Sequence, residues 1–148
     1  MIQPNKSIKS LLVADDDLDD LMLLLSAIQS LRTDVKVCHV RDGGELFSFL
    51  KSESIPDLIL LDINMPKIDG MDCLKRIKSQ PEYNNIPIVM HSTSSNNEII
   101  DRCYQYGASR YIVKPIFYRD IVGFMKMLLA MDWNRARMVS RDEFILSS

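Results

Sequence analysis

The sequence predicts an α/β fold in which a five-stranded parallel sheet is covered by helices on both faces. Short apolar runs alternate five times with segments whose apolar residues recur at helical spacing. The runs are apolar nearly throughout, which is typical of strands buried on both sides of a sheet. Alternation of this kind builds a parallel sheet through right-handed crossovers. The 148 residues are enough for one domain with a single core.

The first two strand and helix units lie in the N-terminal third of the chain. Residues 8–14 and the β-branched run 35–40 are predicted strands. Apolar residues at helical spacing over 18–28 predict the first helix. Residues 46–50 predict a short second helix that follows a Gly-Gly pair.

Three further units complete the alternation. Strands are predicted over 58–61, 86–91 and 110–113, and helices over 71–78, 99–104 and 121–129. We expect the fourth helix to stop at Gly107, because glycine readily adopts the left-handed conformation that ends helices. The fifth helix could run to about Trp133.

Composition narrows the possible classes of protein. The net charge of -2 does not favour nucleic-acid binding, which usually needs a basic surface. The three cysteines form no CxxC pair, so a reducing compartment is expected. Residues 21–28 form the longest apolar stretch, far short of the roughly 20 residues that span a membrane, and no signal-peptide core precedes them. We therefore expect a cytoplasmic protein that is not bound to a membrane.

Chemically active side chains occur where four of the predicted strands end. They are Asp15, Asp16, Asp62, Ser92 and Lys114. In open parallel sheets, ligands bind beyond the carboxyl ends of the strands. Clustered carboxylates resist joint ionisation unless a cation lies among them, and such oxygen ligands suit Mg²⁺. A lysine and a hydroxyl nearby would bind phosphoryl oxygens, so this edge predicts a Mg²⁺-dependent phosphoryl site.

Four segments carry a resemblance to a known family. LLVADD, LLDINMPKIDG, IVMHST and YIVKP resemble, in order and at compatible separations, the receiver domain of two-component response regulators. The resemblance implies a flavodoxin-like (βα)5 doubly wound sheet with strand order 2-1-3-4-5. It assigns residues 8–131 to the receiver. Residues 132–148 would be a C-terminal extension without a separate output domain, which could lengthen the last helix, fold back or stay mobile.

The resemblance also implies roles for the clustered residues. Asp62 would accept a phosphoryl group, and Lys114 would pair with that group. Asp15 and Asp16, together with Asp62 and the backbone carbonyl of Asn64, would hold Mg²⁺. Asp16 would be the direct ligand of the acidic pair, with Asp15 acting through water.

Five other residues would support the site. Ser92 matches the switch hydroxyl, and Tyr111 the aromatic residue whose rotamer follows that hydroxyl. Pro115 would follow Lys114 through a cis peptide bond. Pro66 and Gly70 would shape the loop after the phosphoacceptor. Phosphorylation would then alter the face formed by the fourth helix, fifth strand and fifth helix.

The implied function is that of a switch, not an enzyme with a separate substrate. A sensor histidine kinase or a histidine phosphotransfer protein would donate the phosphoryl group, and an unknown downstream protein would recognise the altered face. The same face could also form a homodimer. Slow self-dephosphorylation is expected, with Asn64 and Ser94 at positions that tune its rate.

Two alternatives remain open from the sequence. Residues 13–17 resemble the strand and DxD motif of haloacid dehalogenase phosphohydrolases, with Asp15 as nucleophile, but that family expects Thr or Val where this chain has Asp19. A pseudo-receiver that keeps the fold without phosphorylation is the other. His91, beside Ser92, is expected to be a packed or surface histidine and not a catalytic one.

Overall fold

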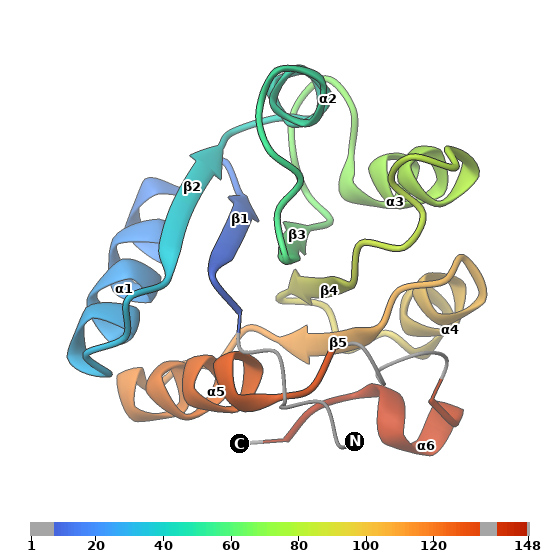
Figure 1. Cartoon of the computed structure of the whole chain (residues 1–148). Helices are drawn as coiled ribbons and strands as arrows, with labels where there is room; N and C mark the ends of the chain where they lie inside the picture. Colours follow the sequence, from blue (N-terminus) through green and yellow to red (C-terminus); the bar gives the residue numbers. More distant parts are fainter. Residues whose placement is uncertain (1–7, 134–138, 148) are drawn as a thin grey trace, which may run out of the picture.

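The fold is a parallel sheet enclosed by helices (Figure 1). The computed structural model describes residues 8–133 and 139–147. Within these residues the strands are β1 (Ser10–Ala14), β2 (Lys36–Val40), β3 (Leu58–Asp62), β4 (Ile88–Ser92) and β5 (Arg110–Val113). They form a five-stranded sheet in the order β2-β1-β3-β4-β5, and every neighbouring pair is parallel. The predicted fold class and strand order are confirmed.

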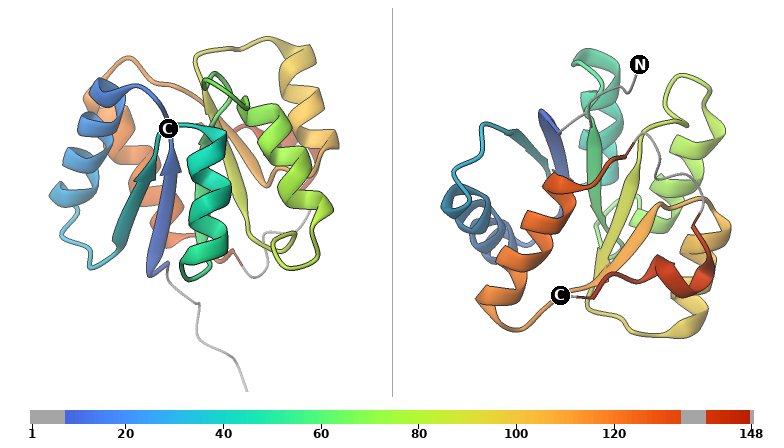
Figure 2. Two further views of the ribbon diagram at one scale, coloured as in Figure 1. Left: turned by 90° about the horizontal axis from the view of Figure 1, so that it is seen from above. Right: turned by 60° about the horizontal axis from the view of Figure 1, so that its bottom comes forward.

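Helices cover both faces of the sheet. One face carries α1 (Leu18–Ser30) and α5 (Tyr118–Ala130), which lie side by side in both views of Figure 2. The opposite face carries α2 (Gly43–Ser52), α3 (Gly70–Ser79) and α4 (Asn97–Gln105). In the described part of the chain, no helix combines the length and apolar character that a membrane span requires.

Strand alternation divides the core into two layers. Leu12 and Ala14 of β1 pack in the layer that contains α2, α3 and α4, whereas Leu11 and Val13 pack in the layer that contains α1 and α5. This division follows from the two-residue period of a strand. All five residues of β3 are buried because this strand lies at the centre of the sheet. The central strand therefore ends at a rigid position.

The second helix starts earlier than predicted. It begins at Gly43 itself, where Asp42 caps it by accepting a hydrogen bond from the Glu45 N–H at 2.8 Å. A Cβ atom on Gly43 would lie 2.5 Å from the Cβ of Ile68. Glycine is thus required here for the close approach of the loop after β3, not as a break before the helix.

The C-terminal segment folds back onto the edge of the sheet. Residues 139–147 contain α6 (Arg141–Phe144), and Ile145 forms a parallel bridge with Tyr111 of β5. Phe144 is fully buried and its ring meets that of Tyr104 edge-on at 5.1 Å. Because α5 ends at Ala130, the extension does not lengthen it. Figure 1 shows α6 beside α4 and β5, and residues 134–138 lie outside the described part.

Candidate functional site

The sheet brings the predicted site residues to one edge. Asp15 directly follows β1, Asp62 ends β3, Ser92 ends β4 and Lys114 directly follows β5. The register pairs Asp62 with His91, so the third and fourth strands end almost level. The Lys114 N–H donates to the Ser92 carbonyl at 2.7 Å, which places the lysine beside the end of β4. Residues up to 99 positions apart thus meet because parallel strands end at a common edge.

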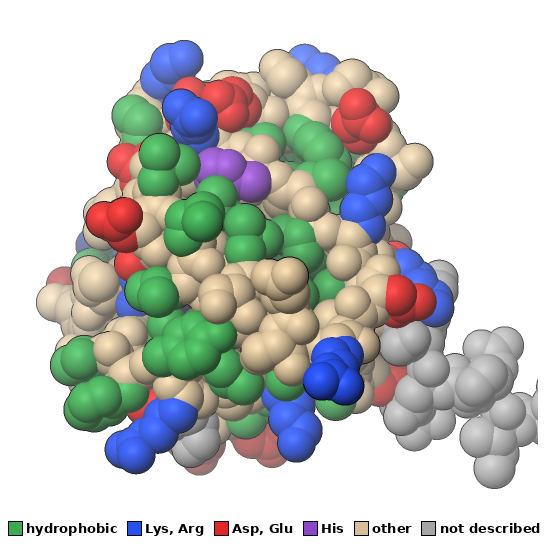
Figure 3. All heavy atoms as spheres, turned by 90° about the vertical axis from the view of Figure 1, so that its left-hand side faces the viewer, with side chains coloured by type: hydrophobic (Ala, Val, Ile, Leu, Met, Phe, Trp, Pro, Cys, Tyr) green, Lys and Arg blue, Asp and Glu red, His purple; other side chains and the backbone are tan. Residues whose placement is uncertain are grey.

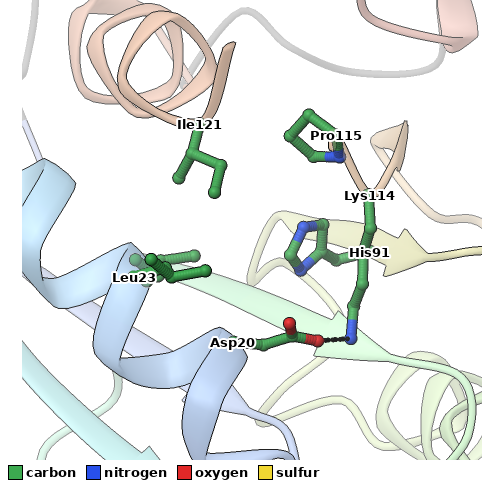
Figure 4. Close-up of a pocket in the computed structure, with 7 residues that line it drawn as sticks. Asp20, Leu23, His91, Lys114, Pro115 and Ile121 are labelled. Atoms are coloured by element: carbon green, nitrogen blue, oxygen red, sulfur yellow. Dashed lines mark hydrogen bonds and ion pairs between the residues drawn. The ribbon is translucent and has the colours of Figure 1, made fainter. Parts of the chain in front are cut away.

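Lys114 is the charged centre of the cluster. Its Nζ lies 3.0 Å from Asp62 Oδ2, 3.1 Å from Asp15 Oδ2 and 2.8 Å from Asp20 Oδ2. Figure 4 shows the lysine pointing toward Asp20 from the opposite side of the site. Burial lowers the pKa of Lys114, but hydrogen bonds with Asp20 and Asp62 outweigh it and raise the pKa above its usual value. The ammonium is therefore charged at physiological pH.

Asp20 is the residue that the sequence analysis missed. It belongs to a run of five acids between residues 15 and 20, and a negative charge in the first turn of a helix needs no further explanation. Asp17 caps α1 by accepting hydrogen bonds from the N–H groups of Asp19 and Asp20. Only the orientation of α1 toward the end of β5 shows that Asp20, and not Asp19, meets the lysine. The concentration of five acids within residues 15–20 was the one feature of the sequence that could have drawn attention to Asp20.

Three carboxylates form a candidate metal site. Oxygen atoms of Asp15, Asp16 and Asp62 all lie within 4.8 Å of one another. Asp15 and Asp62 are buried, whereas Asp16 is exposed. Carboxylate oxygens with an open, solvated side match the preference of Mg²⁺, which retains several waters. The donor set therefore fits the expected ion.

The environment of Asp62 supports the same conclusion. Burial raises its pKa to about 6, and although Lys114 acts in the opposite direction, Asp15 adds repulsion. The Asn64 N–H donates to Asp62 Oδ1 at 3.2 Å and holds the Asn64 backbone beside the carboxylate. A divalent cation would offset the cost of charging Asp62, since an opposite charge favours the ionised form.

The loop after Asp62 is closed by Gly70. The Gly70 N–H donates to the Ile63 carbonyl at 2.7 Å, and Asp69 caps α3 immediately before it. A Cβ atom on Gly70 would overlap the carbonyl oxygen of Asp62 and lie 2.7 Å from the Ile63 Cα. Glycine is therefore the residue that allows the start of α3 to approach the end of β3. Pro66 is exposed within this loop.

The predicted switch residues are linked through one backbone unit. Ser92 is buried and its Oγ accepts a hydrogen bond from the Ser94 N–H at 3.1 Å. The Tyr111 hydroxyl donates to the Ser94 carbonyl at 2.8 Å, with the ring fully buried. A displacement of the loop that contains Ser94 would therefore alter the hydrogen bonds of both Ser92 and Tyr111.

The peptide bond before Pro115 differs from the expectation. No cis peptide bond occurs among residues 8–133 and 139–147, so the predicted cis bond between Lys114 and Pro115 is wrong. The trans form is the more stable one for a bond before proline, by about 0.5–1 kcal/mol. Lys114 reaches its three carboxylate partners with the bond in this form.

His91 lies next to Lys114, on the face of the sheet that α1 and α5 cover. It lines a small hollow with Asp20, Leu23, Lys114, Pro115 and Ile121 (Figure 4). Burial, and then the charge of Lys114, lower its pKa to about 4. The imidazole is consequently neutral at pH 7.

Comparison with known proteins decides the family. A sequence model of the response regulator receiver domain matches residues 11–126. The chain belongs to this family. Receivers are phosphorylation-based signalling switches: they obtain phosphoryl groups from histidine kinases and act on downstream partners. They bind Mg²⁺ or Mn²⁺ at an acidic pocket of the kind formed here by Asp15, Asp16 and Asp62.

Two response regulators of known structure illustrate the similarity. The phosphorylated cyanobacterial phytochrome response regulator RcpA is 34% identical, with a TM-score of 0.77 over 84% of this chain and 96% of its own. Response regulator Rcp1 of Synechocystis sp. is 30% identical over 119 residues, which are 76% of this chain and 81% of Rcp1. The Mn²⁺-bound structure of Rcp1 has a TM-score of 0.76 at 28% identity and covers 83% of this chain and 96% of its own.

Proposed function

We propose that this receiver accepts a phosphoryl group on Asp62, with Mg²⁺ held by Asp15, Asp16, Asp62 and the carbonyl of Asn64. The observation that carries the proposal is the position of the Asp62 carboxylate, which is 3.0 Å from Lys114 Nζ and within 4.8 Å of the other two acids. A buried carboxylate between a fixed ammonium and a cation site is suited to attack on phosphorus. Lys114 would offset part of the charge that the product carries, and a bound Mg²⁺ would offset more of it.

The reaction requires positioning and charge neutralisation more than covalent machinery. Asp62 attacks the phosphorus of a phosphohistidine in line with the departing imidazole nitrogen. Bound Mg²⁺ would supply charge neutralisation and orient the phosphoryl oxygens. Lys114 offers a point charge to one of these oxygens, and the Ser92 hydroxyl can donate a hydrogen bond to another. Asn64 and Ser94 would then influence how readily water hydrolyses the acyl phosphate.

The donor is proposed to be a sensor histidine kinase or a histidine phosphotransfer protein. Exposed apolar side chains on the elements next to the site support a protein donor. Leu18, Met22 and Leu23 of α1 are exposed, as are Ile116 and Phe117 in the segment after Lys114. Hydrophobic side chains also gather on the side of the molecule that carries α1 (Figure 3). Apolar groups around a polar centre are typical of protein contact sites.

Output is proposed to pass through the face formed by α4, β5 and α5. An acyl phosphate adds about -1.5 to -2 charges, and the movement of Ser92 toward it would shift Ser94 and hence Tyr111 on β5. An unknown downstream protein, or a second copy of the chain, would recognise the altered face. We assign residues 8–131 to the receiver. We assign residues 132–148 to an extension, of which residues 139–147 pack on β5 through the Tyr111–Ile145 bridge.

Intact-mass measurement tests the proposal directly. Wild type and Asp62→Asn are incubated with acetyl phosphate, with and without Mg²⁺, and Asp72→Asn on α3 serves as a matched charge control. We expect one phosphate adduct in wild type and in the control, dependent on Mg²⁺ and absent from Asp62→Asn. Full labelling of Asp62→Asn would refute Asp62 as the acceptor.

A pseudo-receiver makes the opposite prediction. Wild type that takes no phosphoryl group from acetyl phosphate, or from a phosphorylated histidine phosphotransfer protein, would support an interaction module without phosphorylation. The phosphohydrolase interpretation has no support from the family match, which is to the receiver domain.

A further inference from the structure

Asp20 contacts the proposed reaction centre but has no role in the function described above. We propose that Asp20 is a positioning residue that binds one N–H of Lys114 and thereby keeps the ammonium directed at Asp62. The inference rests on the proposed function, since it concerns the lysine that would neutralise the phosphoryl group. It adds an acidic residue outside the candidate metal cluster to the machinery of the site.

Each N–H donor of the Lys114 ammonium has a carboxylate partner. A lysine ammonium has three N–H donors, and Lys114 has a carboxylate oxygen from Asp15, Asp20 and Asp62 at 2.8 to 3.1 Å. The shortest of the three distances is the one to Asp20. Because each acid binds one N–H, the hydrogen bonds to Asp15 and Asp20 fix the direction of the third N–H, which points toward Asp62. Removing Asp20 would free the ammonium to turn away from the acceptor.

The three acids are not equivalent in their surroundings. The side chains of Asp15 and Asp62 are 4% and 6% exposed, whereas that of Asp20 is 36% exposed. Asp20 therefore lies on the open side of Lys114, the side from which solvent would compete for the ammonium. A carboxylate there can keep the hydrogen bond to Lys114 that water would otherwise compete for.

The backbone of Asp20 is itself anchored. Its N–H donates to Asp17 Oδ1 at 3.1 Å, which is part of the cap that starts α1. Asp19 donates to the same oxygen at 2.9 Å, yet its side chain is exposed. The two acids thus share the helix cap, the local charge and the first turn of α1. Only Asp20 reaches the lysine, so Asp19 provides a matched control.

Phosphoryl transfer leaves the contact in place. As the P–N bond of phosphohistidine breaks and an O–P bond forms on Asp62, the departing imidazole takes the electron pair of the broken bond. The N–H of Lys114 that pointed at Asp62 then becomes available to a phosphoryl oxygen. The other two N–H groups stay on Asp15 and Asp20. Asp20 therefore holds the lysine in the same direction before and after transfer.

The test compares Asp20→Ala, Asp20→Asn and Asp19→Ala. We expect the rate of Mg²⁺-dependent phosphorylation by acetyl phosphate to fall about tenfold in Asp20→Ala, a loss typical of one charge-assisted hydrogen bond. Asp20→Asn should recover most of that rate, because its amide oxygen can still accept the hydrogen bond. Asp19→Ala should match wild type. A rate that rises in both Asp20 variants would mean that Asp20 repels the phosphoryl donor, which would overturn the inference.

A second measurement follows Lys114 without any phosphoryl donor. Side-chain nitrogen NMR should detect a slowly exchanging Lys114 ammonium in wild type and Asp19→Ala, and should lose it in Asp20→Ala. An unchanged signal in Asp20→Ala would show that Asp20 does not hold the lysine. If wild type takes no phosphoryl group, the proposed function fails and this role fails with it. Asp20 variants that equal wild type in a protein that does label would overturn this inference alone.

Discussion

Replacing Gly70 by alanine should lower the stability of the fold and distort the loop that follows Asp62. The added Cβ would overlap the Asp62 carbonyl oxygen and lie 2.7 Å from the Ile63 Cα and 2.8 Å from the Asp62 carbonyl carbon. All three are backbone atoms at the end of the central strand, so no side chain can turn aside to make room. Relief requires the start of α3 to move away from β3, which would weaken the 2.7 Å hydrogen bond from the Gly70 N–H to the Ile63 carbonyl.

The expected loss follows from these two effects. Overpacking at a rigid site costs about 1–3 kcal/mol, and a weakened backbone hydrogen bond adds roughly 1 kcal/mol. We therefore expect Gly70→Ala to lower the free energy of unfolding by about 2–4 kcal/mol. That is a large share of the roughly 5–15 kcal/mol typical of a domain.

Urea denaturation followed by circular dichroism measures this change, with Gly123→Ala as the control. Gly123 lies inside α5, and a Cβ atom there would meet no other group within 4 Å. Alanine at an open helix position should stabilise the protein by about 0.5–1 kcal/mol. The two substitutions are chemically identical, so opposite signs would isolate the close approach at Gly70. Gly70→Ala with wild-type stability would refute the reasoning.

Three other changes test separate parts of the structure. Burial raises the folded pKa of Asp62 to about 6, so charging this group costs stability as the pH rises from about 4 to 6. Without Mg²⁺, Asp62→Asn should therefore unfold at a higher urea concentration than wild type at pH 7. A lower urea midpoint for Asp62→Asn would contradict a cost of burying the charged carboxylate. Burial lowers the folded pKa of His91 to about 4, so the stability that the neutral imidazole contributes is complete above pH 6.5 and is lost as the pH falls toward 4. His91→Gln should therefore lose less stability than wild type between pH 7 and 5. Parallel pH profiles of the two proteins would argue against a neutral imidazole in the folded state. Phe144→Ala removes a fully buried ring, a change that costs about 3–5 kcal/mol in a core. The Leu146 amide donates to the Tyr111 carbonyl at 2.9 Å, and its hydrogen exchange should become faster in this variant. Unchanged protection of that amide would show that the ring does not hold residues 139–147 on β5.

Much of the fold could be predicted because its signals are local. Each strand appears in the sequence as a short apolar run, and each helix from α1 to α5 as apolar residues at helical spacing, since burial acts on nearby residues with a fixed period. The convergence of Asp15, Asp62, Ser92 and Lys114 was also predictable, because parallel strands place their carboxyl ends at one edge. The strand order came from the family resemblance and not from spacing.

Tertiary packing decided the rest. Asp20 meets Lys114 across 94 positions only because α1 and the end of β5 lie together, and an acid in a first helical turn carries no sign of such a partner. The same holds for Phe144, whose burial depends on a surface formed by α4 and β5. The cis bond expected before Pro115 came from the family resemblance, whereas the bond is trans, the form such bonds prefer by about 0.5–1 kcal/mol. The sequence by itself thus determined which elements form and which groups end the strands. The three-dimensional arrangement decided which distant side chains complete the site, because those contacts depend on how whole elements pack and not on any local pattern.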